Sequence, residues 1–145
     1  MNKNSRQVQQ KLHTIEDCYL IEIPKIMDQR GNLAVIENGI LPFKMKRVYY
    51  LFDVPAGAYR GGHAHKKQQE FLVAISGSFE VLLDDGLQKK SILLNRPDRG
   101  LLIPTGIWRE LQDFSHGSVC LVLNSDQFDE ADYIRDYTRF LQSDY

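Results

Sequence analysis

The stretch RGGHAHKKQQEFLVAISG, residues 60–77, decides how this chain folds. Its segment 71–75 is apolar over the length of a buried strand, and the Ser-Gly pair that follows is a turn signal. Just before it, His63 and His65 are separated by one residue. In a strand their side chains therefore share one face, with Cα atoms about 7 Å apart. Two glycines precede the pair and leave room for a ligand or a bend, so the stretch predicts β-structure that carries two imidazoles on one face.

Short runs rich in β-branched and aromatic residues recur on both sides of this stretch, separated by Gly, Pro, Asp and Asn. The Asp-Asp-Gly turn at 84–86 suits a tight hairpin. About eight strands at this regular spacing predict an all-β sandwich, barrel or jelly roll. The expected strands cover residues 19–23, 32–37, 47–53, 71–75, 78–83, 91–94, 100–103 and 118–124.

The two ends of the chain depart from this pattern. Apolar residues within 129–141 recur at helical spacing, which predicts one short C-terminal helix, capped by Asp129 or a neighbouring Asp. Residues 1–16 are polar with few apolar anchors, so we expect a flexible N-terminal arm. Without repeats or linkers, the remainder, 17–145, is expected to form a single domain.

The composition excludes several classes of function. Eighteen Lys and Arg against nineteen Asp and Glu leave a net charge of -1, so we expect no nucleic-acid partner. No apolar run approaches the length of a membrane span, so no membrane partner is expected either. The polar first residues and the widely separated Cys18 and Cys120 favour a cytoplasmic protein with reduced thiols.

A spaced pattern around the histidine pair resembles the first sequence motif of the cupin superfamily. Its positions are Gly57, His63, His65, Glu70 and Gly77. The stretch GLLIPTGIWR, residues 100–109, resembles the second cupin motif, in which a proline and a glycine precede a histidine. Cupins are small β jelly rolls, which agrees with the strand count. We therefore expect a single-domain cupin jelly roll with a short C-terminal helix.

One departure from the cupin pattern concerns metal binding. Metal-binding cupins usually gather two His, one Glu and the second-motif His, but the last position here is Arg109. A guanidinium cannot ligate a cation and repels it. Although His63, His65 and Glu70 remain as potential ligands, we expect no metal.

A closer resemblance extends over nearly the whole chain beyond the arm. The blocks that carry it, in order, are DQRGNLAVIE at 28–37, KRVYY at 46–50, RGGHAHKK at 60–67, LDDG at 83–86, WRE at 108–110, DFS at 113–115, SD at 125–126 and DYIRDY at 132–137. They resemble the sugar 3,4-ketoisomerase family. The resemblance implies a cofactor-independent isomerase that converts dTDP-4-keto-6-deoxyglucose into a dTDP-3-keto-6-deoxyhexose through an enediolate, in deoxyamino-sugar biosynthesis. It also implies a metal-free homodimer, in which subunits often exchange N-terminal strands.

This reaction moves a carbonyl from C4 to C3, so it requires a base, a second proton shuttle and donors for the oxyanion. We assign His63 as the base and His65 as the second acid/base, because imidazoles titrate near neutral pH. Alternation over residues 47–52 places Arg47 and Tyr49 on one face, expected to line the cavity. Tyr49 is the expected third catalytic residue, with an interfacial structural role as the alternative. The opposite face, Val48, Tyr50 and Phe52, is apolar and expected to be core.

Substrate binding calls for cations, because guanidinium groups pair with diphosphate in bidentate fashion. Arg60 is expected to contact phosphate, and Arg30 to reach the same group from its own or from the other subunit. Arg47 and Arg109 are expected to shape the cavity, and Glu70 to orient a histidine or an arginine. Trp108 is expected to flank the sugar or to fill the mouth of the barrel.

Three other functions remain open at this point. A sugar-nucleotide 3/5-epimerase runs similar chemistry, but such epimerases typically have one His with an acidic partner, whereas this chain has two. A non-catalytic cupin that binds a sugar nucleotide is the second alternative. A metal-dependent oxygenase is the third, and Arg109 disfavours it.

Overall fold

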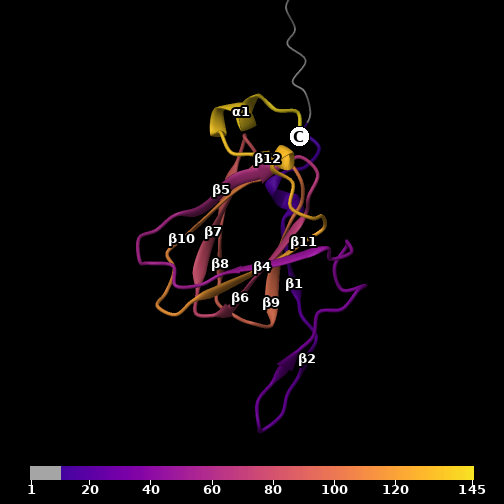
Figure 1. Ribbon diagram of the computed structural model, residues 1–145, viewed down its shortest axis with the longest axis vertical. Coiled ribbons are helices and arrows are strands. Elements are labelled where there is room, and N and C mark those ends of the chain that lie inside the picture. Colours follow the sequence, from indigo (N-terminus) through magenta and orange to yellow (C-terminus); the bar gives the residue numbers. More distant parts are fainter. Residues whose placement is uncertain (1–10) are drawn as a thin grey trace, which may run out of the picture.

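Two five-stranded antiparallel sheets face each other across an apolar core in the computed structural model, which describes residues 11–145 (Figure 1). The first sheet has the order β1 (Tyr19–Glu22), β9 (Arg99–Ile103), β6 (Glu70–Ser76), β11 (Val119–Asn124) and β4 (Arg47–Leu51). The second has the order β12 (Tyr133–Ile134), β5 (Arg60–His65), β10 (Trp108–Gln112), β7 (Phe79–Asp84) and β8 (Lys89–Leu94). From β4 to β7 and from β8 to β11 each strand crosses to the opposite sheet. The predicted all-β jelly roll is confirmed.

The inner faces of the two sheets change from apolar to polar along the strands. On β6 the inward residues run Ala74, Leu72 and then Glu70, and on β10 Leu111 is followed by Arg109. All five are buried. One end of the sandwich is therefore a hydrophobic core, whereas the other end collects charged side chains at the same depth.

A second apolar layer covers the outer face of the first sheet. Phe71, Val73 and Leu123 point outward from β6 and β11 and are buried under the segment that connects β3 (Leu33–Ala34) to β4. This layer explains why β6 is apolar in sequence on both of its faces.

The prediction that Val48, Tyr50 and Phe52 form core is wrong. Their exposed fractions are 56%, 60% and 61%. The alternation assigns these residues to one face correctly, but β4 is an edge strand and its inward face carries Tyr49 and Leu51 instead. The outer face of this edge strand is not covered by any segment within residues 11–145. Val48, Tyr50 and Phe52 therefore form an exposed apolar patch, which we call the β4 patch.

The C-terminal segment differs from the predicted helix over 129–141. It forms a 3-10 turn, η2 (Glu130–Asp132), then β12, then the short helix α1 (Tyr137–Gln142). The backbone of β12 pairs with β5, and this ladder outweighs the helical pattern. Asp129 caps η2 by accepting a hydrogen bond from the Ala131 N–H, and Asp136 caps α1.

Four strands lie outside the eight expected runs, namely β2 (Lys25–Ile26), β5, β10 and β12, although β-structure was expected for β5 from its histidine pair. β12 lay inside the expected helix, and the mixed polarity of β10 hid its strand character, because its inward side carries a charge. In contrast, the expected strand at 32–37 is reduced to β3.

The N-terminal segment is partly attached to the body of the molecule. Residues 1–10 of the expected arm lie outside the described residues. Within the described part, Ile15 in η1 (Ile15–Asp17) is buried in the core, and its N–H donates to Asp85 Oδ2 over 2.9 Å. No helix in the described residues 11–145 is long and apolar enough to cross a membrane.

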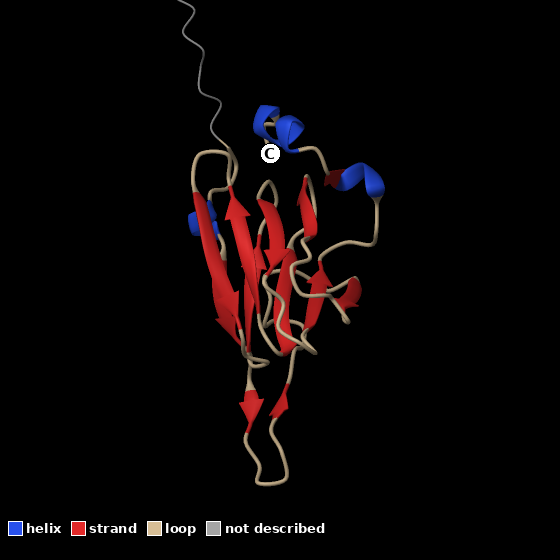
Figure 2. Cartoon of the chain, turned by 90° about the vertical axis from the view of Figure 1, so that its left-hand side faces the viewer, coloured by secondary structure: helices blue, strands red, loops and turns tan. Residues whose placement is uncertain are grey.

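A hairpin projects from the body. Strands β2 (Lys25–Ile26) and β3 pair only with each other, and Figure 2 shows them extending beyond both sheets at the end away from α1. Arg30 lies in the turn between them with a side chain that is 90% exposed, and it donates two hydrogen bonds to the Asp28 carboxylate.

Candidate active site

The histidine pair lies at the polar end of the sandwich, where β5 runs between β12 and β10. His63 is paired with Arg109 on β10, and His65 with Tyr133 on β12. Both rings are only 4% exposed, and their centroids are 4.8 Å apart. The expected sharing of one face by the two imidazoles is confirmed.

Glu70 is the buried acceptor around which the site is organised. Its Oε1 accepts a hydrogen bond from Arg109 Nε over 2.9 Å, and its Oε2 accepts from Arg109 Nη2 over 3.0 Å. The Tyr49 hydroxyl donates to Oε2 over 2.9 Å, and Asn124 Nδ2 donates to the same oxygen over 3.3 Å. Because a buried carboxylate needs such partners, the sequence expectation that Glu70 orients an arginine agrees with the geometry.

The charges in this cluster stabilise each other. Burial opposes the ionisation of Glu70, but the Arg109 guanidinium and the neighbouring His63 and His65 together outweigh this effect and hold the pKa of Glu70 well below its ordinary value. Burial likewise opposes the charge on Arg109, but Glu70 and Tyr49 together outweigh this effect and raise the pKa of Arg109 above its ordinary value. Burial and the negative Glu70 raise the pKa of Tyr49, so its phenol keeps its proton and remains a hydrogen-bond donor.

The donor set does not fit a metal cation. Ligand atoms of His63, His65 and Glu70 lie within 4.8 Å of one another. Both oxygens of Glu70 are engaged by Arg109, whose guanidinium supplies the positive charge that a cation would bring. That no metal is needed stays a prediction, which this arrangement supports.

His63 is free to accept a proton. Within residues 11–145 neither of its ring nitrogens has a hydrogen-bond partner, and the nearest carboxylate oxygen, Glu70 Oε1, is 3.7 Å from Nε2. Burial and the positive charge of Arg109 lower the pKa of His63 to about 4. The ring is therefore neutral at neutral pH, with a lone pair available.

A cavity of about 370 Å³ opens in front of His63. Five of the residues singled out from the sequence line it. They are Arg47, Tyr49, Arg60, His63 and Arg109. Glu70 and His65 lie behind this wall, in contact with Arg109 and His63 respectively.

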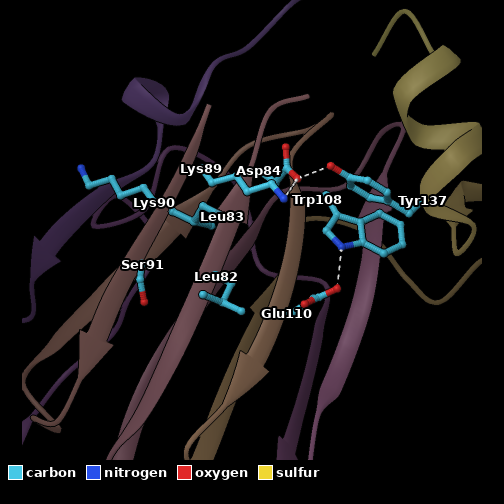
Figure 3. Close-up of a pocket in the computed structure, with 9 residues that line it drawn as sticks. All are labelled: Leu82, Leu83, Asp84, Lys89, Lys90, Ser91, Trp108, Glu110 and Tyr137. Atoms are coloured by element: carbon cyan, nitrogen blue, oxygen red, sulfur yellow. Dashed lines mark hydrogen bonds and ion pairs between the residues drawn. The ribbon is translucent and has the colours of Figure 1, made fainter. Parts of the chain in front are cut away.

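Two other predicted site residues lie away from this cavity altogether. Arg30 lies on the projecting hairpin. Trp108 lies on the outer side of the second sheet, in a separate cavity of about 350 Å³, where its ring packs on Tyr137 and its Nε1–H donates to Glu110 (Figure 3). Alternation along β10 accounts for this, because Arg109 faces inward and its neighbour Trp108 must face outward.

Besides Leu51 and Gly61, sequence reasoning missed three lining residues from the C-terminal segment. Phe128, Tyr133 and Arg135 complete the wall, with the Tyr133 ring 4.9 Å from the ring of His63. Tyr133 was interpreted as part of an apolar helix face, and no local pattern indicates that this segment returns to β5. The available signal was the block 132–137, which contributed only to the family resemblance.

The chain matches known proteins over nearly its whole length. The family model FdtA, described as WxcM-like, C-terminal, matches residues 16–144. A TDP-4-oxo-6-deoxy-alpha-D-glucose-3,4-oxoisomerase from Aneurinibacillus thermoaerophilus is 48% identical over 122 residues, which are 83% of this chain and 88% of that protein.

Solved structures agree with this match. A 3,4-ketoisomerase from Helicobacter canadensis is 44% identical, with a TM-score of 0.85 over 87% of this chain and 96% of the other. The sugar 3,4-ketoisomerase QdtA from Thermoanaerobacterium thermosaccharolyticum, solved in complex with TDP, is 40% identical, with a TM-score of 0.87 over 89% and 95%.

Removing the cation from the buried cluster should destabilise the fold. In Arg109→Met, Glu70 is left without its buried partner, and the free energy of unfolding in urea should fall by about 3–5 kcal/mol. The double variant Arg109→Met/Glu70→Gln should recover much of this loss, because it also removes the charge. Arg135→Met, which breaks an exposed pair with Glu130, should cost less than about 1 kcal/mol. A single Arg109→Met variant as stable as the wild type would contradict the proposed role of the pair.

The protonation of His63 can be followed directly. We expect the ring nitrogens of His63, observed by ¹⁵N NMR, to titrate with a midpoint near pH 4, because burial and Arg109 disfavour the imidazolium. The ring should stay neutral above that pH and gain its proton only as the pH falls through it. The His63→Asn variant identifies the signals by their loss. A midpoint near the ordinary value of about 6.5 would show that the site does not disfavour the cation.

Proposed function

The chain belongs to the FdtA family of sugar 3,4-ketoisomerases, and from this membership we propose that it converts dTDP-4-keto-6-deoxyglucose into a dTDP-3-keto-6-deoxyhexose. The observation that carries the proposal is the neutral imidazole of His63, which has no hydrogen-bond partner within residues 11–145 and lies at a cavity wall that also presents Arg109 and Tyr49. Proton transfer next to a ketone requires such a base together with hydrogen-bond donors to the developing oxyanion. The names of the relatives support TDP as the nucleotide.

The proposed reaction begins at His63. Its free nitrogen removes the C3 proton of the substrate, and the electron pair of that bond moves onto the C4 carbonyl to give an enediolate. A proton then passes from the C3 hydroxyl to the oxygen on C4, and another is delivered to carbon C4. The net result is a ketone at C3 and a hydroxyl at C4. The imidazolium formed at His63 lies beside Glu70, whose negative charge stabilises it.

Arg109 and Tyr49 are the proposed donors to the enediolate oxygen. Arg109 Nη2 donates to the Tyr49 hydroxyl over 2.9 Å, and that hydroxyl donates to Glu70. The Tyr49 phenol has a raised pKa and keeps its proton, so it is a hydrogen-bond donor rather than a base. Its single O–H points to Glu70 in the free enzyme and must turn to the enediolate oxygen when the substrate binds. His65 remains the proposed second acid/base, and its position behind His63 suits the exchange of protons with that ring.

Positively charged side chains at the rim of the cavity are proposed to bind the diphosphate of the substrate. Arg60 and Arg135 are exposed at the opening, and the half-buried Arg47 donates to the Tyr133 hydroxyl over 3.0 Å. Since Arg109 is engaged by Glu70, these three guanidinium groups are the ones proposed to contact phosphate, and Arg135 would have to exchange its bidentate pair with Glu130 for the diphosphate. Arg47 and Arg60 were expected from the sequence, and Arg135 joins them here.

Epimerisation at C3 or C5 and binding without turnover are the competing functions. Incubation of the wild type with dTDP-4-keto-6-deoxyglucose in deuterated buffer should place deuterium at C4 of a 3-keto product, detected by NMR. Exchange at C5 would indicate an epimerase, and no exchange would indicate binding alone.

The His63→Asn variant tests the role of the base. It should lose about 1,000-fold or more in kcat, because no other free base lines the cavity among the described residues, while binding of TDP is retained. The matched control is His116→Asn, which changes an exposed histidine and should keep normal kinetics. Unchanged turnover in His63→Asn would remove His63 from this role.

We also propose that two copies of the chain form a homodimer. The β4 patch exposes Val48, Tyr50 and Phe52 side by side, and such apolar surface is typical of a protein interface. Arg30 is presented on a hairpin that makes no contribution to the cavity of its own chain. In a symmetric dimer this hairpin can deliver Arg30 to the phosphate site of the partner. An exchange of N-terminal strands would replace the pairing of β1 with β9 of the same chain.

Complementation tests whether Arg30 acts across the dimer. Arg30→Ala alone should raise the KM for the sugar nucleotide and lower activity, and His63→Asn alone should be inactive. When the two variants are co-expressed with different tags and the mixed dimer is isolated, one site regains both wild-type residues if Arg30 comes from the partner. Activity should then return to about half of the wild-type value. A mixed dimer no more active than its parents would place Arg30 outside the site of the partner.

A further inference from the structure

Asp132 is a buried carboxylate to which the reaction above gives no role. It ends η2, is 5% exposed, and its Oδ2 lies 3.0 Å from His65 Nδ1. The same oxygen accepts the N–H of Gln68 over 3.2 Å, and the backbone C=O of Asp132 accepts the N–H of Lys66 over 3.0 Å. Asp132 is therefore anchored to the segment that directly follows His65, so its position relative to the ring is fixed.

The contact determines which nitrogen of His65 carries the hydrogen. An ionised carboxylate only accepts hydrogen bonds, so Nδ1 must donate to Asp132. In the neutral ring the lone pair is then on Nε2, which lies 3.4 Å from Glu70 Oε1 and has no hydrogen-bond partner in the described part of the chain. The proton-accepting atom of His65 thus faces the interior of the site.

We infer that Asp132 is a positioning residue that holds His65 in the Nδ1–H form, so that Nε2 is the atom through which His65 exchanges protons. This inference deepens the proposed ketoisomerase reaction and rests on it. It also gives the two histidines different roles, because the ring of His65 is held by a carboxylate whereas His63 has no such partner among residues 11–145.

The charged groups around His65 support this difference in role between the two histidines. The groups that face its ring are Asp132 from η2, Glu70 from β6, His63 from the same strand and Tyr133 from β12, with Arg109 of β10 bound to Glu70. A proton added at Nε2 would lie next to Glu70, and a carboxylate would then flank each nitrogen of the cation. His65 is in this way placed to exchange a proton through Nε2, and His63, which has no hydrogen bond to a carboxylate among residues 11–145, is placed to act as the base.

The conservative variant Asp132→Asn tests the inference. Its amide keeps the shape of the carboxylate but can donate to Nδ1, which drives the hydrogen of His65 to Nε2. With the wrong tautomer, kcat should fall by about 100-fold to 10,000-fold, while KM changes by less than about 3-fold. The matched control, Asp129→Asn, removes a charge from the exposed cap of the same η2, where Asn is an equally good cap, and should change kcat by less than about 2-fold.

A spectroscopic readout distinguishes this inference from the proposed function. The ¹⁵N shifts of the His65 ring, recorded at a pH where it is neutral, should show hydrogen on Nδ1 in the wild type and on Nε2 in Asp132→Asn. These shifts report on the contact even if the chain proves not to be a ketoisomerase. Hydrogen on Nε2 in the wild type would overturn the inference without any variant, and so would a switched tautomer with unchanged kcat. A merely structural role would lower stability and leave the tautomer as it is.

Discussion

A buried ion pair across the two sheets is the constraint on which the rest of the molecule depends. Glu70 belongs to the first sheet and Arg109 to the second, and their two hydrogen bonds join the sheets at the polar end of the sandwich. Isolated, either charge would be costly to bury, so Tyr49 and Asn124 supply the further contacts that a buried carboxylate needs. The same guanidinium also supplies the positive charge next to the histidines. Stability and site chemistry thus depend on one contact.

The site forms because the inward face of β6 passes from an apolar environment at one end of the strand to a polar environment at the other. The alternation that buries Leu72 in the core also buries Glu70 two residues earlier, at the same depth. At that depth water is largely absent, so a single nearby charge has a large effect. This explains why His63, close to Arg109, stays neutral, and why a cavity lined by arginines can still hold a free base.

Period-two patterns predicted an all-β sandwich, barrel or jelly roll, the shared face of His63 and His65, and the inward direction of Tyr49, and the resemblance to cupins selected the jelly roll. What they could not predict depends on contacts between distant segments. Alternation assigns Tyr50 to a face but does not say whether that face is covered, so its exposure was missed. The pairing of β12 with β5 is likewise a long-range event, and the helical spacing of 129–141 concealed it together with its contribution to the cavity.

The route of the C-terminal segment has a consequence for biosynthesis. Asp132, Tyr133 and Arg135 close the back and the side of the pocket, and β12 supplies the last backbone partners of β5. All of them follow β11 in the chain, so a nascent polypeptide that has reached the end of β11 contains the first sheet, four strands of the second sheet and only part of the pocket. The last part of the pocket wall is therefore also the last part of the chain to be synthesised, and the site cannot be complete before translation of this segment is finished.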